Sequence, residues 1–305
     1  MNSISRRAVL RGGAALAVAG FMSSPARAIG HLTTGDGELT IMADGFIKLP
    51  LSAAMPDVPQ AELEKLLTDN GLATDALVND CNVTVLRKGE QLVIFDAGAG
   101  PNFLPSTGRL ASNLAEAGID PTAVTDVVFT HAHPDHIWGV TDDFDELLFP
   151  EARYHISQTE WDFWRSEGAL DAMPEARRNF VPGARNRFDR IEDKVSFFMP
   201  GDEVIEGVEV VGTPGHTPGH SSFMVHGGDT PVHILGDAAT NLAVSLERPD
   251  WPTGADQDPD TAIKTRTALL DRLANDKAWV IGFHFPHPGA GTIERKGAAY
   301  RFVTA

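Results

Sequence analysis

The sequence is poor in cysteine, in basic residues and in long apolar runs, and each shortage excludes something. The single cysteine among 305 residues, Cys81, rules out an intrachain disulfide. Because free cysteine is usually buried, we expect Cys81 in the core. Lysine and arginine number 25 against 42 aspartates and glutamates, a formal charge of −17. Since nucleic acids and anionic membrane surfaces attract basic proteins, this charge argues against both as partners.

The amino terminus has the features of an export signal. The paired arginines Arg6 and Arg7 precede an uncharged stretch over 12–22, and Ala26-Arg27-Ala28 is a typical cleavage site. The pair resembles a twin-arginine signal, and an ordinary secretory signal with two arginines is the alternative. We therefore predict a signal peptide over residues 1–28, the twin-arginine export machinery as a partner in transit, and a periplasmic or secreted mature protein.

The mature chain is expected to be a single globular domain over residues 29–305. Four of the basic residues and none of the acidic ones precede residue 29, so the mature formal charge is −21, which favours solubility. A membrane-spanning helix needs about 20 apolar residues, and the apolar part of the signal is too short, so we expect no stable membrane anchor. The composition is compatible with a monomer or a homodimer.

Strands and helices interleave along this domain, without an internal repeat. The strands fall into two groups with helices between them, which favours two packed sheets with helices outside, an α+β fold. We expect strands over 38–47, 82–87, 91–96, 124–130, 152–156, 195–200, 204–211, 232–235 and 279–283, and helices over 59–67, 106–117, 158–167 and 261–274.

Four potential metal ligands stand within six residues directly after the apolar strand 124–130. They form the run His131-Ala132-His133-Pro134-Asp135-His136, in which the proline permits a sharp turn. Imidazole and carboxylate together suit zinc, manganese, iron or cobalt, and such zinc sites are common in hydrolases. The alternative, a solvated polar loop, is disfavoured by the spacing.

This run resembles the HxHxDH motif of the metallo-β-lactamase superfamily. Four further segments are similar to other motifs of that family and occur in its order: Phe95-Asp96-Ala97-Gly98, Thr213-Pro214-Gly215-His216, Leu235-Gly236-Asp237 and Gly282-Phe283-His284. The resemblance covers nearly all of the mature chain. It implies an αββα sandwich, with two mixed sheets inside, helices outside and a metal site at one edge.

The resemblance also implies two divalent metal ions, with zinc as the first candidate. In such a site a metal-bound hydroxide attacks an ester, lactone or phosphotriester, and Asp135 receives the proton as a catalytic residue. The implied alternatives are a glyoxalase-type thioesterase and a non-catalytic metal-binding factor of the cell envelope. The implied ligands are His131, His133 and His216 for one ion, Asp135, His136 and His284 for the other, and Asp237 as the bridge between them.

Other polar residues near these motifs allow two interpretations. Asp96 could orient a ligand through a hydrogen bond or simply occupy a turn. His220 is expected to be a hydrogen bonder rather than a ligand, whereas His287 could face the groove or belong to a loop. Four histidines lack partner spacing and are expected to be hydrogen-bonded or solvated: His31, His155, His226 and His233.

The segments 282–286 and 160–164 are most similar to the methyl parathion hydrolases, whose neighbours include quorum-quenching lactonases. This similarity implies a neutral, partly apolar small-molecule substrate. Phe103, Trp138 or the 161–164 helix could line an apolar groove, although aromatic residues at helical spacing usually mark a buried face, so we expect Trp161 and Trp164 in the core.

Three differences from known subclasses of the superfamily bear on the expected substrate. Homoserine-lactone hydrolases of this superfamily commonly have a tyrosine three residues after the bridging aspartate, and here Thr240 occupies that position. A zinc β-lactamase with a cysteine ligand would need that cysteine late in the chain, whereas Cys81 is early. No basic cluster near the carboxyl end would hold a glutathione carboxylate. Lactone hydrolysis thus stays open but lacks its expected hydroxyl.

Overall fold

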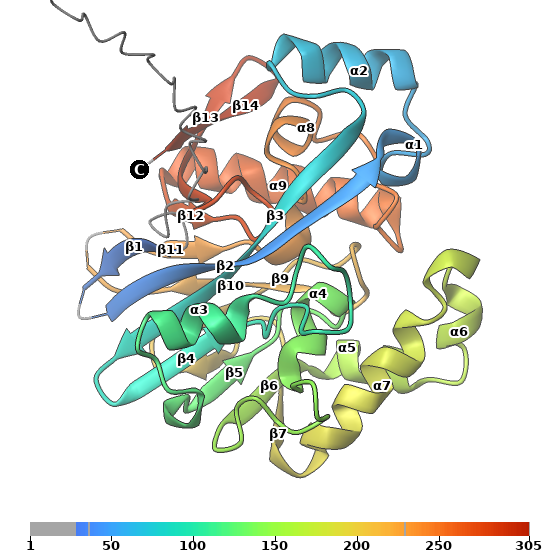
Figure 1. Ribbon diagram of the computed structural model, residues 1–305. Coiled ribbons are helices and arrows are strands. Elements are labelled where there is room, and N and C mark those ends of the chain that lie inside the picture. The colour runs from blue at the N-terminus through green and yellow to red at the C-terminus, as the bar shows by residue number, and fades with distance from the viewer. Residues whose placement is uncertain (1–28, 36, 229, 305) are drawn as a thin grey trace, which may run out of the picture.

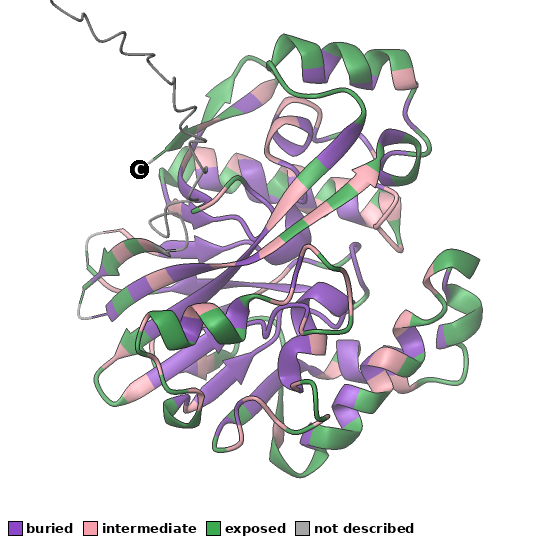
Figure 2. Cartoon of the chain, in the orientation of Figure 1, coloured by how far each residue is buried: buried purple, intermediate pink, exposed green. Residues whose placement is uncertain are grey.

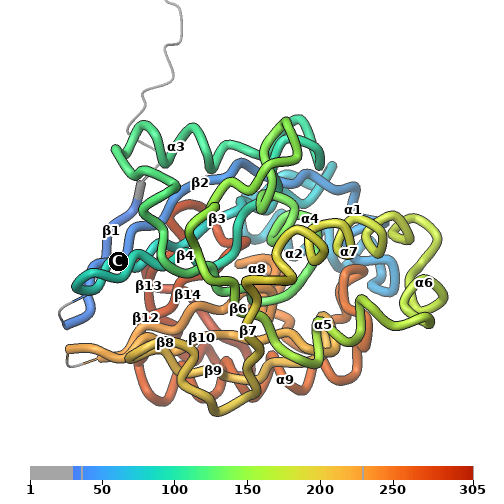
Figure 3. Tube along the Cα trace, turned by 90° about the horizontal axis from the view of Figure 1, so that it is seen from below, coloured from blue at the N-terminus to red at the C-terminus, as the bar shows by residue number. Residues whose placement is uncertain are grey.

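Two seven-stranded sheets lie face to face, and helices cover the outer face of each (Figure 1). The computed structural model describes residues 29–35, 37–228 and 230–304, so the predicted signal peptide lies outside the described residues. Seen from below, helix α3 (Leu110–Glu116) lies on one outer side of the strands and helix α9 (Pro259–Asp276) on the other (Figure 3). The predicted α+β fold, an αββα sandwich, is confirmed.

The first sheet follows the chain, in the order β1-β2-β3-β4-β5-β6-β7. Its first four strands pair antiparallel, whereas β4 to β7 pair parallel. Parallel neighbours need crossover connections, and these carry the helices of the outer face. The strands are β1 (Ile29–Thr34), β2 (Gly37–Pro50), β3 (Ala76–Lys88), β4 (Gln91–Phe95), β5 (Asp126–Val128), β6 (Arg153–Ser157) and β7 (Val195–Phe198).

The second sheet has the order β14-β13-β12-β11-β10-β9-β8. All its pairs are antiparallel except β11 with β12, which are parallel. Its strands are β8 (Glu203–Ile205), β9 (Val208–Gly212), β10 (Ser221–Val225), β11 (Val232–Ile234), β12 (Trp279–Ile281), β13 (Ala290–Lys296) and β14 (Ala299–Thr304).

The helices lie mainly in the connections between strands. No helix among the described residues is long and apolar enough to span a bilayer. Besides α3 and α9, the α-helices are α1 (Leu51–Ala54), α2 (Gln60–Asp69), α4 (Pro134–Ile137), α5 (Gln158–Arg165), α6 (Ala169–Ala172), α7 (Phe180–Ile191) and α8 (Leu242–Glu247), and the 3₁₀ turns are η2 (Pro121–Ala123), η3 (Trp138–Val140), η4 (Glu175–Arg177), η5 (Glu192–Lys194) and η6 (Gly236–Ala238).

Strand β4 shows how the layers pack. Successive side chains of a strand point to opposite faces: Val93 and Phe95 belong to the core between the sheets, whereas Leu92 and Ile94 pack beneath the outer helices. The ring centroids of Phe95 and of Phe223 in the second sheet are 5.4 Å apart. Figure 2 shows the strands in the middle of the sandwich mostly buried and the outer sides of the helices exposed. Each fully buried side chain of this kind stabilises the fold by about 1.5–3 kcal/mol.

The single strand predicted over 204–211 is wrong. The structure has two strands there, β8 and β9, which form a hairpin. Gly207 lies between them with φ +79°, a left-handed conformation that glycine adopts without steric cost. The apolar alternation continues across this turn, so the sequence pattern does not reveal it.

The sequence patterns also misplace the start of one helix and miss several elements, namely α1, α4, α6, α7, α8, β1, β10, β13 and β14. The helix predicted over 106–117 begins only at Leu110, because the Asp44 carboxylate accepts the backbone N–H groups of Gly108 and Leu110 at 3.2 and 2.8 Å and holds the preceding residues in a loop. Helix α7 is the longest of the missed helices, and it contains Pro182, a typical helix breaker. This proline lies in the first turn, where a backbone N–H has no partner within the helix, so the helix tolerates it.

Candidate metal centre

Loops from both sheets meet at one edge of the sandwich. In the first sheet, Asp96 follows β4 and the 131–136 loop follows β5. In the second sheet, Asp237 follows β11, His284 follows β12, and His216 lies between β9 and β10. The carboxyl ends of parallel strands are where open α/β sheets place their ligands. The topology therefore brings together residues that are far apart in the sequence.

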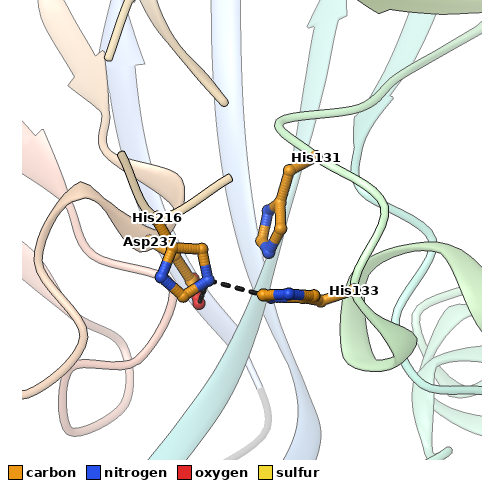
Figure 4. Close-up of side chains that lie close together, drawn as sticks. All are labelled: His131, His133, His216 and Asp237. Atoms are coloured by element: carbon orange, nitrogen blue, oxygen red, sulfur yellow. Dashed lines mark hydrogen bonds and ion pairs between the residues drawn. The ribbon is translucent and has the colours of Figure 1, made fainter. Parts of the chain in front are cut away.

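Cluster 1 consists of His131, His133, His216 and Asp237, whose side chains converge from three connections, those after β5, between β9 and β10, and after β11 (Figure 4). All four are buried, and one potential ligand atom of each lies within 4.8 Å of the others. His133 Nδ1 is 2.9 Å from His216 Nε2, which is also 3.2 Å from Asp237 Oδ2.

Cluster 2 shares Asp237 and adds His136 and His284. His136 Nε2 lies 3.2 Å from Asp237 Oδ1, and His284 Nε2 lies 3.3 Å from Asp237 Oδ2. Asp135 Oδ2 is 3.3 Å from the first of these nitrogens and 3.2 Å from the second. Asp135 and His284 also form a group with the buried Cys81. The Asp237 carboxylate thus faces histidines of both clusters.

The donor atoms of these clusters fit metal ions. Four of them are buried and make no hydrogen bond: His131 Nε2, Asp135 Oδ2, His136 Nε2 and Asp237 Oδ1. Buried polar atoms without a partner are costly and rare in native proteins, and here all four point into the same small volume. Imidazole nitrogens and carboxylate oxygens are ligands that zinc and similar divalent ions prefer. The residues of both clusters could therefore hold divalent metal ions.

The carboxylates control the protonation of the histidines. Burial alone lowers the pKa of His136, His216 and His284, but the neighbouring carboxylates, Asp237 first among them, outweigh this effect at all three. The pKa of His216 rises to about 9, and the pKa values of His136 and His284 are raised well above the usual range. Burial and neighbouring histidines lower the pKa of His131. Because a metal binds only neutral imidazole, it must displace protons from the first three.

Asp96 supports the histidine loop from behind. Its carboxylate accepts hydrogen bonds from the backbone N–H and the hydroxyl of Thr130, both at 2.8 Å, and its Oδ2 lies 2.8 Å from His136 Nδ1. The backbone φ of Asp96 is +64°, in a region that residues other than glycine rarely adopt. Both interpretations of Asp96 therefore hold, because the residue occupies a turn and its carboxylate orients His136.

Asp256 orients His216 in the same way. Its Oδ1 lies 3.0 Å from His216 Nδ1, which leaves Nε2 directed at Asp237. Asp256 is itself only 1% exposed and lies 3.6 Å from the buried guanidinium of Arg266. Burial raises the pKa of Asp256, but His216 and Arg266 outweigh this effect and the pKa is lowered overall. The carboxylate is thus fixed as an anion behind the imidazole.

His220 holds the loop that carries Asp237. Its Nε2 accepts the backbone N–H of Asp237 at 2.8 Å, while its Nδ1 contacts the hydroxyl and the carbonyl oxygen of Thr213 at 2.8 and 3.1 Å. Both ring nitrogens are therefore occupied by the protein. Burial lowers the pKa of His220 to about 3, so the ring is neutral.

His287 belongs to the loop that carries His284. The carbonyl oxygen of Asp80 lies 2.8 Å from His284 Nδ1, and the Asp80 carboxylate accepts the backbone N–H of His287 at 2.8 Å. Asn82 Oδ1 lies 2.8 Å from His287 Nδ1. His287 is in none of the metal-ligating groups found among the described residues, so the loop interpretation holds.

An aromatic wall stands beside cluster 1. The ring centroids of Phe103, Trp138 and Phe180 lie 5.7 to 6.5 Å apart, and all three side chains are partly exposed. The Phe180 ring is 5.8 Å from the His133 ring, and so is the Trp164 ring on another side. An uncharged, partly apolar molecule can pack against this wall while it touches the metal loops.

Residues 76–284 match the model of the metallo-beta-lactamase superfamily. The chain belongs to this superfamily. It is a metal-dependent hydrolase, as the motifs of the sequence indicate.

Relatives from distant organisms share this superfamily domain. A metallo-beta-lactamase domain-containing protein 1 of Xenopus laevis is 33% identical over 197 residues, which are 64% of this chain and 68% of that protein. An uncharacterized protein of Mycobacterium leprae is 29% identical over 240 residues, which are 76% of this chain and 95% of the relative. A probable metallo-hydrolase of Mycobacterium tuberculosis is 26% identical, with 52% of this chain and 56% of the relative covered.

Two solved structures of the superfamily are similar over most of the chain. AidC, described as a dizinc quorum-quenching lactonase and solved with the product N-hexanoyl-L-homoserine, is 30% identical and superimposes with a TM-score of 0.86, covering 91% of this chain and 97% of AidC. The hydrolase AbOPH is 25% identical with a TM-score of 0.84 and the same coverage. The predicted branch, close to quorum-quenching lactonases, is consistent with these neighbours.

The structure brings together every residue that the superfamily motifs single out. Their roles as metal ligands, and that of Asp135 as proton acceptor, stay predictions. Trp161 and Trp164 are buried, as expected, and Cys81 is in the core, where burial raises the pKa of its thiol to about 12. The seven residues are His131, His133, Asp135, His136, His216, Asp237 and His284.

The four histidines predicted to lie outside the site do so. His31, His155 and His226 each contact a carboxylate. His233 differs from the expectation that it would be hydrogen-bonded or solvated: it is 1% exposed, and neither ring nitrogen has a hydrogen-bond partner in the described part of the chain.

Sequence reasoning missed two buried carboxylates of the site, Asp256 and Glu160. Nothing in the sequence around Asp256 indicates its role. Glu160 could have been found, because it stands four residues before Trp164 on the same face of the predicted helix. A carboxylate on the buried face of a helix needs partners, since burying it alone is costly.

Proposed function

We propose that the protein hydrolyses neutral, partly apolar esters, lactones or phosphotriesters with two divalent metal ions, zinc being the first candidate. The observation that carries the proposal is the position of Asp237. Its Oδ1 faces His136, and its Oδ2 faces His216 and His284. A carboxylate placed between two sets of histidines suits a bridge between two ions. The description of AidC as a dizinc enzyme supports the proposal of two ions.

The chain and the ions would divide the chemistry between them. When bound, the two ions would supply an activated water and polarise the oxygen of the scissile bond. The chain aims the imidazoles, through Asp96 behind His136 and Asp256 behind His216. Asp135, whose carboxylate lies beside His136 and His284, is the group that we propose accepts the proton of the attacking water.

The aromatic wall supports a neutral substrate. Phe103, Trp138 and Phe180 offer apolar contact next to His133, whereas the burial of the ionic groups around the clusters makes the entry of an additional unpaired charge costly. The substrate's acyl, aryl or alkyl group would pack on this wall while its ester or phosphoryl centre reaches the ions.

The missing tyrosine bears on the lactone subclass. Thr240 is buried and makes no hydrogen bond to cluster 1 or cluster 2 within the described residues, while the two tyrosines of the sequence are engaged elsewhere: the Tyr154 hydroxyl bonds the Phe149 carbonyl, and the Tyr300 hydroxyl bonds Asp271. If lactones are hydrolysed, the carbonyl oxygen must therefore be polarised without a tyrosine hydroxyl.

The place of action is part of the proposal. The paired arginines at Arg6 and Arg7 and the cleavage site at 26–28 support export by the twin-arginine route. That route carries folded proteins, so the metals could be loaded before export. The mature protein would act in the periplasm or outside the cell.

The proposal is tested by a substrate panel measured on mature protein whose metal content is determined in the same sample. The panel comprises an aryl ester, an acyl-homoserine lactone, methyl parathion and a glutathione thioester. We expect turnover of the first three classes with two metals per chain and preference for at least one of them over the thioester. A preference for the thioester, or two bound metals without turnover of any substrate, would contradict the proposal and favour the thioesterase or the non-catalytic metal-binding factor.

A further inference from the structure

The carboxylate of Glu160 collects four hydrogen bonds in the interior. Its side chain is 0% exposed. Oε1 accepts the backbone N–H of Ala132 at 3.0 Å and the indole N–H of Trp164 at 2.6 Å. Oε2 accepts the hydroxyl of Thr217 at 2.7 Å and the backbone N–H of Gly219 at 3.0 Å. No other carboxylate in the described residues accepts as many hydrogen bonds from the protein, and Asp44 and Asp96 have three each.

Three of these donors belong to the two loops that carry the histidines of cluster 1, and the fourth, the Trp164 indole, lies on α5 with Glu160. Ala132 lies between His131 and His133, in the loop after β5 of the first sheet, and Thr217 follows His216 in the loop between β9 and β10 of the second sheet. Glu160 itself is on α5, directly after β6. One carboxylate therefore joins the two sheets at the point where the three histidines of cluster 1 must keep their spacing.

The loop around Gly219 is built for this close approach. A Cβ at Gly219 would lie 2.2 Å from the backbone nitrogen of Glu160, so any other residue would push the loop away from α5. The indole that Glu160 holds belongs to Trp164, whose ring is 5.8 Å from that of His133. The close backbone contact at Gly219 and the ring contact between Trp164 and His133 thus both link α5 to the loops that carry the histidines of cluster 1.

The histidines that cluster 2 adds have different supports. Asp96 contacts His136 Nδ1, and the Asp80 carbonyl contacts His284 Nδ1. None of the four hydrogen bonds of Glu160 involves either histidine or its supports. Removing the Glu160 carboxylate therefore removes hydrogen bonds beside His131, His133 and His216 and leaves the supports of His136 and His284 in place.

We propose that Glu160 is a positioning residue that sets the metal affinity of cluster 1 by holding its two loops in register. The inference rests on the proposed function only in taking the two clusters as two metal positions. Ionised carboxylate is required because all four partners are donors and a carboxylate is purely an acceptor. An amide has one oxygen, so its NH₂ group must face two donors, and at least one backbone N–H of the loops is left without an acceptor.

The test is the variant Glu160→Gln, with Asp126→Asn as the matched control. Asp126 is also a fully buried carboxylate with two partners, His155 at 2.8 Å and Arg153 at 2.9 Å, and it contacts neither cluster. Zinc occupancy at each position is read from anomalous scattering in crystals equilibrated at decreasing free zinc, with chelator competition in solution as the second measurement. Neither readout involves turnover.

We expect Glu160→Gln to weaken zinc binding at cluster 1 by about 10- to 100-fold, the usual effect of losing a group that orients ligands, and to change the other position by less than about threefold. Asp126→Asn should lower the melting temperature and leave both affinities within about threefold. If Glu160→Gln does not fold, Thr217→Val removes one donor to Oε2 and is expected to weaken cluster 1 in the same selective way.

Two results overturn the inference: equal weakening at both positions, or no change at either, in a variant that folds. The unmodified protein separates this failure from failure of the proposed function. If it binds two zinc ions and the Glu160 variant behaves like it, only the inference fails. If the unmodified protein binds fewer than two, the dinuclear proposal fails first.

Discussion

Removal of the metal ions should destabilise the protein by several kcal/mol. Without them, four buried donor atoms lack a partner: His131 Nε2, Asp135 Oδ2, His136 Nε2 and Asp237 Oδ1. A buried polar atom left unsatisfied costs about 1–3 kcal/mol, so the four together cost about 4–12 kcal/mol. The ion-pair contacts of 3.2–3.3 Å between the histidines and the two aspartates offset part of this cost. We therefore expect metal removal to lower the free energy of unfolding by about 4 kcal/mol.

The assay compares the thermal unfolding of zinc-loaded protein with that of the same protein after chelation, with metal content measured on both. About 4 kcal/mol corresponds to a fall in melting temperature of about 8–16 °C at 2–4 °C per kcal/mol for a domain of this size. Chelator presaturated with zinc is the control and should cause no shift. A fall of less than about 2 °C in protein shown to be metal-free would refute the reasoning, because it would mean that the buried donors are satisfied by other groups.

Three further predictions follow from the site and the core. Asp237→Asn should lower zinc affinity at both clusters by more than the roughly 10- to 100-fold that loss of an orienting partner costs, and turnover with it; retention of both metals, measured per chain, would contradict the shared role of this carboxylate. Phe180→Ala should raise the KM for apolar substrates by about 5- to 30-fold, the equivalent of about 1–2 kcal/mol of lost apolar contact, with the metal content unchanged; an unaltered KM would show that the aromatic wall does not touch substrate. His233→Leu should reduce the acid sensitivity of folding. Burial lowers the pKa of His233 to about 3, so between about pH 6.5 and 3 the unfolded chain binds a proton that the folded chain does not, and stability falls by about 1.4 kcal/mol per pH unit as the pH decreases. Chemical unfolding at a series of pH values should show a slope smaller by that amount in the variant, and parallel slopes would contradict it.

The sequence predicts the site better than the elements that position it. The 131–136 run and the segments ending in His216, Asp237 and His284 were recognisable because metal ligation needs particular residue types at fixed spacing. Their convergence could not be derived from periodicity alone, because it depends on which strands are neighbours in each sheet. The resemblance to a known family supplied that information.

The supporting residues were harder to predict because their roles depend on contacts between distant segments. Asp96 left two interpretations open, and the structure shows both, since a turn conformation and a hydrogen bond to His136 do not exclude each other. Asp256 reaches His216 from a loop with no periodic pattern. Glu160 could be noticed in the sequence, because it is a carboxylate on the apolar face of a predicted helix. Its partners could not be predicted, because they belong to loops that are distant in the sequence and close only in the folded chain.

The errors in secondary structure have a similar origin. Gly207 divides one expected strand into two because its left-handed backbone makes a hairpin, which apolar alternation does not register. Asp44 delays the start of α3 through hydrogen bonds from a different strand. Helix α7 tolerates Pro182 only because of its place in the first turn. In each case a single interaction, either local or with a distant segment, outweighs the helix or strand preference of the sequence pattern.

The most direct test of the central claim is an anomalous difference map from crystals of zinc-loaded protein, measured on both sides of the zinc absorption edge. We predict two peaks about 3.5–4 Å apart, as in other two-metal hydrolytic sites, one within ligand distance of His131, His133 and His216 and the other of His136 and His284, with Asp237 between them. One peak only, or peaks away from these side chains, would contradict the account.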